Sequence, residues 1–221
     1  MRVHFADRKG PSPQPSPGVP GEGEKARPAA IRDDFAGACY DSPPMIRPAT
    51  IHDVPRIEEI INSHAGLGKM LFKSYAQLYE DLRDFGVYEE NGEVIGCCAV
   101  TIIWADLAEV RSLAVDEIQI GRGLGRQLVQ WAIDEARRLG IRRLMALTYE
   151  QTFFEKMGFS VVLKEALPLK VWSDCVRCPK RDECDEIAMV LTLHDVPVSD
   201  QPAAAPTPRG VSIPVLEFSE D

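Results

Sequence analysis

Positive charge, long apolar runs and apolar residues near the two ends are all scarce in this sequence. Lysine and arginine number 25 against 34 aspartates and glutamates, and the resulting net charge of −9 disfavours nucleic acid as a partner. The longest apolar run, Val94 to Ala105, is too short to cross a bilayer and carries Thr101 in its middle. The first residues contain no apolar core of the kind that a signal peptide needs. We therefore expect a soluble cytoplasmic protein with neither a nucleic-acid nor a membrane partner.

The two ends of the chain are rich in proline and glycine and lack the large apolar residues that a core needs. We therefore expect residues 1–44 and 195–221 to be disordered. Residues 45–194 lie between them and have the length of a common domain, about 100–150 residues. The sequence leaves open whether Met45 is the true initiator or residues 1–44 form a native arm. We predict one domain over residues 45–194, with a cysteine-bearing insert at 165–185.

Apolar residues along this domain alternate between helical and strand spacing. Helical spacing predicts four helices, at 53–66, 74–85, 124–139 and 152–157. Extended patterns predict strands at 45–47, 87–90, 93–104, 109–115, 141–148, 159–164 and 186–193. Ser74 and Gln77 fit a capping box, and Asn91-Gly92 fits the type I′ turn of a hairpin. The pattern predicts an α/β fold in which helices cover both faces of a mixed sheet.

A loop with three glycines, Gly121, Gly123 and Gly125, joins the 109–115 strand to the following helix. Backbone N–H groups freed by residues without a Cβ, at the positive end of a helix dipole, form a cradle for a diphosphate. The loop follows the fourth strand of the domain, which disfavours dinucleotide binding of the Rossmann type. Gly125 is followed by Arg126 instead of Lys, which excludes a Walker loop. A tight connection that binds no ligand remains the alternative.

This strand–GxGxG–helix unit resembles motif A of the GNAT acetyltransferase superfamily, which binds the pyrophosphate of acetyl-CoA. The segment FFEKMGF at 153–159 resembles the superfamily's motif B, FYEKLGF, and the resemblance covers residues 45–193. It implies a mixed, mostly antiparallel sheet of six to seven strands flanked by about four helices, and acetyl-CoA as co-substrate. The cofactor-binding positions that it implies are Leu113, Ala114, Val115, Gly121, Arg122, Gly123, Leu124, Gly125, Arg126 and Phe154.

Two positions depart from the superfamily's pattern. Ile120 stands in the slot that usually carries Arg or Gln, with Gln119 one place earlier. The pyrophosphate would therefore rely on the backbone N–H groups of residues 121–126, with Arg122 and Arg126 adding charge. Phe154 stands where motif B usually has a tyrosine that protonates the departing thiolate. Water is a sufficient proton source for a leaving thiolate, because the thiol pKa is about 8.5.

Attack on a thioester requires a neutral amine, so a base must remove a proton. Glu109, at the start of the strand that leads to the glycine loop, is the candidate base, acting through water. Many members of the superfamily carry a glutamate on the corresponding strand. The alternative is that Glu109 pairs with Arg111 on the same strand face.

A closer resemblance is to the acetyltransferase domain of N-acetylglutamate synthase. It rests on IRPATIHDV at 46–54, LFKSYAQLYEDL at 71–82, the missing motif B tyrosine and LPLK at 167–170. It implies acetylation of the α-amine of L-glutamate, the first step of arginine biosynthesis, by direct transfer. Lys73, Arg111 and Lys170 are the candidates for binding the substrate carboxylates, and ordinary surface cations are the alternative for each.

Other functions stay open at this point. The amine could be another small molecule, such as glutamine or a polyamine. The chain could also be a non-catalytic regulatory module that binds acetyl-CoA or a metal. Because GNAT domains often dimerise, a homodimer is possible.

Three cysteines in the insert follow the pattern C-x2-C-x5-C: Cys175, Cys178 and Cys184. Two thiolates at the first of these spacings can grip one tetrahedral zinc ion. Asp174, Asp185 or His194 could supply a fourth ligand. The alternative is a compact loop of three thiols that covers the substrate.

Overall fold

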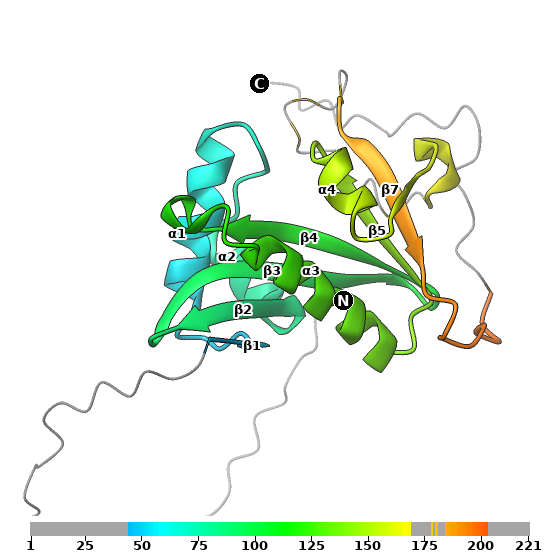
Figure 1. The fold of residues 1–221 in the computed structure, drawn as a ribbon, viewed down its shortest axis with the longest axis horizontal. Helices are drawn as coiled ribbons and strands as arrows, with labels where there is room; N and C mark the ends of the chain where they lie inside the picture. The colour runs from blue at the N-terminus through cyan, green and yellow to red at the C-terminus, as the bar shows by residue number, and fades with distance from the viewer. Residues whose placement is uncertain (1–43, 169–177, 179, 181–183, 203–221) are drawn as a thin grey trace, which may run out of the picture. The chain divides into compact units, whose positions relative to one another are not determined.

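The computed structural model describes residues 44–168, 178, 180 and 184–202. In these residues a seven-stranded sheet has the order β1-β2-β3-β4-β5-β7-β6 (Figure 1). The strands are β1 Met45–Pro48, β2 Phe85–Glu90, β3 Glu93–Trp104, β4 Leu107–Val115, β5 Arg143–Thr148, β6 Ser160–Val161 and β7 Ile187–Thr192. Only β4 and β5 run parallel, and every other neighbouring pair is antiparallel. The predicted order of elements and the mixed, mostly antiparallel sheet are confirmed.

Helices lie on both faces of this sheet, as the periodicity predicted. They are α1 Val54–Gly66, α2 Tyr75–Glu80, α3 Leu124–Arg138 and α4 Gln151–Glu155. Single 3-10 turns occur at Leu82–Asp84, Glu117–Gln119 and Lys164–Ala166. Among the helices of the described residues, none is both long enough and apolar enough to cross a membrane.

Separate apolar clusters fill the two faces of the sheet. The α1 face packs Ile57 and Ile61 against strand residues that include Cys97. On the α3 face, Leu128 packs in a cluster that includes Cys98. Adjacent strand residues point to opposite faces, so the two cysteines enter different clusters. Both thiols are buried core groups, as predicted. This burial raises the pKa of the Cys97 thiol to about 12.

The predicted helix at 74–85 is wrong at its C-terminal end. Its capping box is present, because Ser74 Oγ accepts a hydrogen bond from Gln77 N while Gln77 Oε1 accepts one from Ser74 N. The α-helix then ends at Glu80, and Phe85 is the first residue of β2, paired with Ala99. The periodicity placed Phe85 on a helical stripe, whereas the aromatic ring is buried by joining the sheet.

A divergence of β4 from β5 opens the centre of the sheet. The two strands pair only where Leu107–Glu109 faces Arg143–Met145. Beyond Glu109, β4 and β5 separate (Figure 1), while β5 stays paired with β7 up to Thr148. The C-terminal halves of β4 and β5 therefore form the two arms of a V.

The predicted tail at 195–221 begins in contact with the domain. Val196 is buried, Asp195 pairs with Arg137 of α3, and the Trp104 indole N–H donates to the carbonyl of Pro202 over 2.7 Å. Residues 195–202 therefore pack on the domain. Residues 1–43 and 203–221 lie outside the described part of the chain.

Candidate active site

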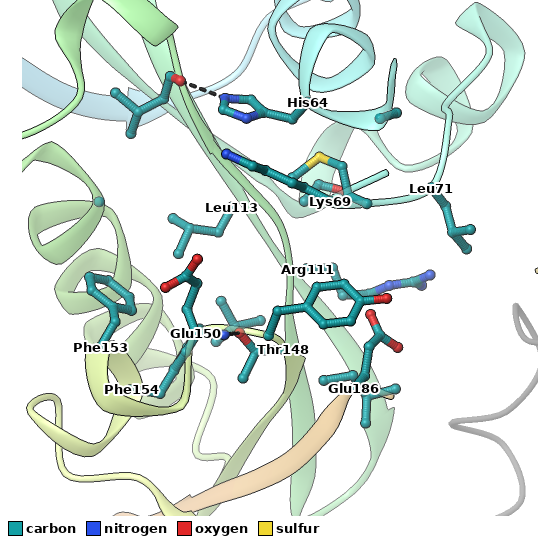
Figure 2. Close-up of a pocket in the computed structure, with 18 of the residues that line it drawn as sticks. His64, Lys69, Leu71, Arg111, Leu113, Thr148, Glu150, Phe153, Phe154 and Glu186 are labelled. Atoms are coloured by element: carbon teal, nitrogen blue, oxygen red, sulfur yellow. Dashed lines mark hydrogen bonds between the residues drawn. The ribbon is translucent and has the colours of Figure 1, made fainter. Parts of the chain in front are cut away.

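A cavity of about 1210 Å³ occupies the opening between β4 and β5. The connection between α1 and α2 forms one wall, and the glycine loop and α4 form another. Residues around the end of β5 and the start of β7 complete it (Figure 2). Segments that are far apart in the sequence thus meet at one place.

The glycine loop has the backbone that the sequence predicted for it. Gly121 and Gly123 have φ values of 91° and 80°, in the left-handed region that a Cβ disfavours. Gly123 is the N-cap of α3, and no side-chain hydrogen bond caps this helix. The first N–H groups of α3 are therefore available to an anion. The cavity lining includes Gly121, Gly123, Leu124, Gly125 and Arg126.

Arg122 differs from the rest of this loop because its side chain turns to a protein carboxylate. Its guanidinium donates two hydrogen bonds, of 2.8 and 2.7 Å, to the carboxylate of Glu90 on β2. Arg122 is not among the residues that line the cavity. Its predicted contribution to cofactor binding would require release from Glu90.

A β-bulge distorts β4 where it passes the cavity. Three residues of β3, Cys97 to Ala99, are matched by four on β4, from Ala114 to Arg111. Ser112, inside the bulge, has a φ of 49°. Leu113 and Val115 line the cavity, whereas the Ala114 side chain is buried in the α1 cluster. A bulge leaves one residue outside the ladder, so β4 can offer a backbone group to a ligand here.

Two phenylalanines of α4 form the aromatic wall beside the glycine loop. Phe154 is buried and packs edge to face on both Phe153 and Phe159, with ring centroids 5.1 Å apart in each pair. Phe153 Cζ lies 3.7 Å from the position that a Cβ on Gly125 would occupy. Phe154, the predicted cofactor-binding residue, contributes an apolar surface and no proton donor.

Glu109 lies in the cavity lining and is only 7% exposed. Burial raises the pKa of its carboxyl to about 7, and the charge of Glu186 adds to the increase. Arg111 and Lys73 act in the opposite direction. Arg111 Nε lies 3.6 Å from Glu109 Oε2, so the alternative of a pair on one strand face is present in the structure. A carboxyl with this pKa is half ionised near neutrality and can accept a proton.

The other predicted cations of the substrate site have distinct positions. Lys73 lines the cavity, and its ammonium lies 3.0 Å from Asp81. Two hydrogen bonds of 3.0 Å with the side-chain amide of Asn62 hold its backbone. Lys73 and Arg111 are therefore brought to the same cavity. Lys170 lies outside the described residues.

Comparison with known proteins identifies the family of this chain. A sequence model of the Acetyltransferase (GNAT) family matches residues 55–159. An uncharacterized N-acetyltransferase of Chlorobaculum tepidum is 44% identical over 148 residues, which are 67% of this chain and 96% of that protein. The chain belongs to the GNAT acetyltransferase family. The GNAT fold and the N-acetyltransferase class that the motifs predicted are confirmed.

Two further relatives carry more specific names. An amino-acid acetyltransferase of Mycobacterium tuberculosis is 34% identical over 140 residues, 62% of this chain and 80% of that protein. The crystal structure of N-acetylglutamate synthase from Neisseria gonorrhoeae, complexed with coenzyme A and N-acetyl-glutamate, superimposes with a TM-score of 0.63. Its identity is 29%, over 70% of this chain and 36% of the synthase chain. The present GNAT chain thus corresponds to about a third of that longer enzyme.

Sequence reasoning missed several polar residues of this GNAT cavity, among them His64, Tyr149 and Glu186. His64, on α1, donates from Nε2 to the carbonyl of Val115 over 2.8 Å, because a carbonyl can only accept. Tyr149 directly follows β5, and its hydroxyl accepts a hydrogen bond of 3.3 Å from Lys180. Glu186 directly precedes β7, and burial raises its pKa. Since Thr148 pairs with Ile187, the register places Tyr149 and Glu186 next to each other. Tyr149 and Glu186 stand at the ends of predicted strands, and this position could have indicated them as site residues from the sequence.

The cysteines of the insert reach the same cavity. Cys178 and Cys184 are free thiols that line it, and Cys184 Sγ lies 3.9 Å from a Glu186 carboxylate oxygen. Cys175 lies outside the described residues. Within the part that is described, no group of three or more His, Cys, Asp or Glu side chains could hold a metal ion. Zinc at Cys175, Cys178 and Cys184 therefore stays a prediction.

Proposed function

We propose that this GNAT enzyme transfers the acetyl group of acetyl-CoA to the α-amine of L-glutamate, the reaction that begins arginine biosynthesis. The observation that carries the proposal is the meeting of Glu109, Arg111 and Lys73 in one cavity beside the glycine loop. The names of the amino-acid acetyltransferase and of the N-acetylglutamate synthase, and the two ligands of the latter, support it.

The excess of cationic side chains in the cavity lining suits two anionic ligands. Among the described residues, its lining has six Lys and Arg side chains and four Glu side chains, in a chain whose net charge is −9. The cations are Lys69, Lys73, Arg111, Arg126, Lys164 and Lys180. A local excess of positive charge favours a diphosphate and a carboxylate-bearing amino acid over a polyamine.

In the proposed reaction, both substrates bind together and the amine attacks the thioester carbonyl directly. Ionised Glu109 removes the amine proton through a water molecule. A backbone N–H freed by the bulge at Ser112–Leu113 stabilises the oxyanion of the tetrahedral intermediate. Collapse of this intermediate breaks the carbon–sulfur bond and expels the CoA thiolate, which takes a proton from water or from Tyr149. Arg111 and Lys73 hold the substrate carboxylates.

The test is a panel of amines incubated with the purified protein and acetyl-CoA, with release of free thiol measured over time. L-Glutamate should give the highest kcat/KM among L-glutamate, L-glutamine, L-aspartate and spermidine, and mass spectrometry should find N-acetylglutamate. A preference for spermidine would contradict the assignment of a carboxylate pocket. Binding of CoA without turnover of any amine would contradict catalysis and favour a regulatory module. The predicted homodimer, zinc site and cytoplasmic location are separate predictions.

A further inference from the structure

The cations around the cavity divide into those with a protein partner and those without one. Lys73 pairs with Asp81, Arg111 pairs with Glu109, and Lys180 pairs with Asp185 at 3.5 Å. The Lys164 ammonium donates to the carbonyl of Cys184 over 2.9 Å. In the stretches that the structure describes, the charged ends of Lys69 and Arg126 have no hydrogen bond or ion pair.

Lys69 is placed by the way α1 ends. Gly68, with a φ of 71°, donates its N–H to the carbonyl of Ala65 and turns the chain out of the helix. The Lys69 N–H donates to the carbonyl of His64 over 3.1 Å. The His64 ring is in turn hydrogen bonded to the carbonyl of Val115, the last residue of β4. Hydrogen bonds through His64 therefore link the backbone of Lys69 to the end of β4, which leads into the glycine loop.

The side chain of Lys69 points into the cavity beside His64 and away from the guanidinium of Arg111 (Figure 2). Leu113 of β4 lies below it in this view. The ammonium therefore lies on the side of Leu113 and away from Arg111 and Glu186. Since β4 runs from Leu113 through Val115 toward the glycine loop, this side is the loop end of the cavity.

The glycine loop itself presents little charge to a ligand. Arg122 is bound to Glu90, and Ile120 is an exposed apolar residue. The loop supplies backbone N–H groups and Arg126, whereas a diphosphate carries two negative charges. A cation that faces the loop across the cleft would balance the remaining charge.

We propose that Lys69 binds a diphosphate oxygen of acetyl-CoA from the side of the cleft opposite the glycine loop. This inference rests on acetyl-CoA being the donor under the proposed function. The connection between α1 and α2 then contacts the cofactor on one side of the cleft, and the glycine loop contacts it on the opposite side.

Calorimetric titration with CoA tests the contact without any amine substrate. Lys69→Met should weaken CoA binding about tenfold, and Lys69→Arg should restore most of the affinity. The matched control is Lys156→Met, which removes an exposed lysine outside the cavity lining and should leave the affinity unchanged. If the unaltered protein does not bind CoA, the proposed function fails. If the unaltered protein and Lys69→Met bind CoA equally, the assignment of Lys69 fails alone.

A second measurement separates the diphosphate from the substrate carboxylate. Acetyl-pantetheine donates the same acetyl group and lacks the diphosphate. Lys69→Met should raise the KM for acetyl-CoA about tenfold while leaving kcat/KM for acetyl-pantetheine at the level of the unaltered enzyme. An increase confined to the KM for the amino acid would assign Lys69 to the substrate carboxylate and overturn the proposal. Because substitution of an exposed side chain rarely prevents folding, both variants are suitable for these assays.

Discussion

The two ends of the cavity are built in different ways. At the glycine-loop end, one continuous segment supplies most of the proposed cofactor contacts, and left-handed glycines at 121 and 123 give the loop its shape. At the other end, Glu109, Lys73 and Glu186 come from three separate parts of the chain. In the proposed function, the first end binds mainly through backbone groups, and the second acts through charged side chains whose properties depend on burial and on one another. The glycine-loop end should therefore tolerate loss of single side chains better than the Glu109 end does.

The largest effect is expected at Glu109. Glu109→Gln keeps the shape of the side chain but cannot accept the amine proton, so kcat should fall about 100-fold or more. In the unaltered enzyme, kcat/KM should rise with pH through about 7, because only the ionised carboxylate is a base. This step should be absent in the variant. Glu93→Gln, an exposed strand substitution, is the control and should change nothing. A variant that keeps both its rate and the pH step would return Glu109 to a purely structural pair with Arg111.

Thermal unfolding gives a second readout for the same residue. The folded-state pKa of Glu109 is raised above its value in the unfolded chain. The stability linked to its neutral form is therefore present at low pH and is lost as the pH rises through about 7. The Tm of Glu109→Gln relative to the unaltered protein should be higher at pH 8 than at pH 4. An equal difference at both pH values would show that the carboxyl does not titrate as its burial implies.

Arg111 should have the next largest effect, in two measurable quantities. Arg111→Gln should raise the KM for L-glutamate about 10- to 100-fold, because a charge-assisted hydrogen bond to a carboxylate is lost. It should also move the pH step of kcat/KM above 7, since Arg111 lowers the pKa of Glu109. Arg111→Lys retains the charge and should keep the pH step nearly in place. A change in KM without a change in the pH profile would separate substrate binding from the electrostatic effect.

At the glycine-loop end, Gly123→Ala should raise the KM for acetyl-CoA about tenfold. A Cβ finds no steric obstacle there, but the φ of 80° disfavours it. Such strain costs about 1–2 kcal/mol. Gly140→Ala places a Cβ at a comparable φ of 73° after α3, away from the cavity, and is the matched control. Both variants should lose similar stability, and only Gly123→Ala should change the KM. If Gly123→Ala and the unaltered enzyme had the same KM for acetyl-CoA, the left-handed turn would not shape the cofactor site.

The smallest effects are expected for the two arginines of the loop. Arg126→Gln should raise the KM for acetyl-CoA about two- to fivefold, and added salt should diminish the difference, because Arg126 is an exposed charge. Arg122→Gln should change the KM less, because Glu90 already binds that guanidinium. The reverse order would show that Arg122 leaves Glu90 when the cofactor binds.

Local patterns in the sequence predicted most of the fold. Asn91-Gly92, the Ser74 capping box and the glycines of the loop determine conformation through their own backbone preferences, so they needed no tertiary information. The helix predicted up to residue 85 shows the limit of this reasoning. Phe85 fits a helical stripe and a strand equally well, and pairing with β3 decided between them.

The sequence alone predicted the GNAT fold and the backbone of the glycine loop, because left-handed glycines and a helix N-terminus are local features. The tertiary structure decided which side chains act together. The separation of β4 and β5 opened the cavity, burial raised the pKa of Glu109 to about 7, and Glu90 engaged Arg122. No motif in the sequence marks Lys69. It lines the cavity because the turn at the end of α1 directs it there. Burial and charge pairing depend on residues that are distant in the chain, so periodicity and motifs could not assign them.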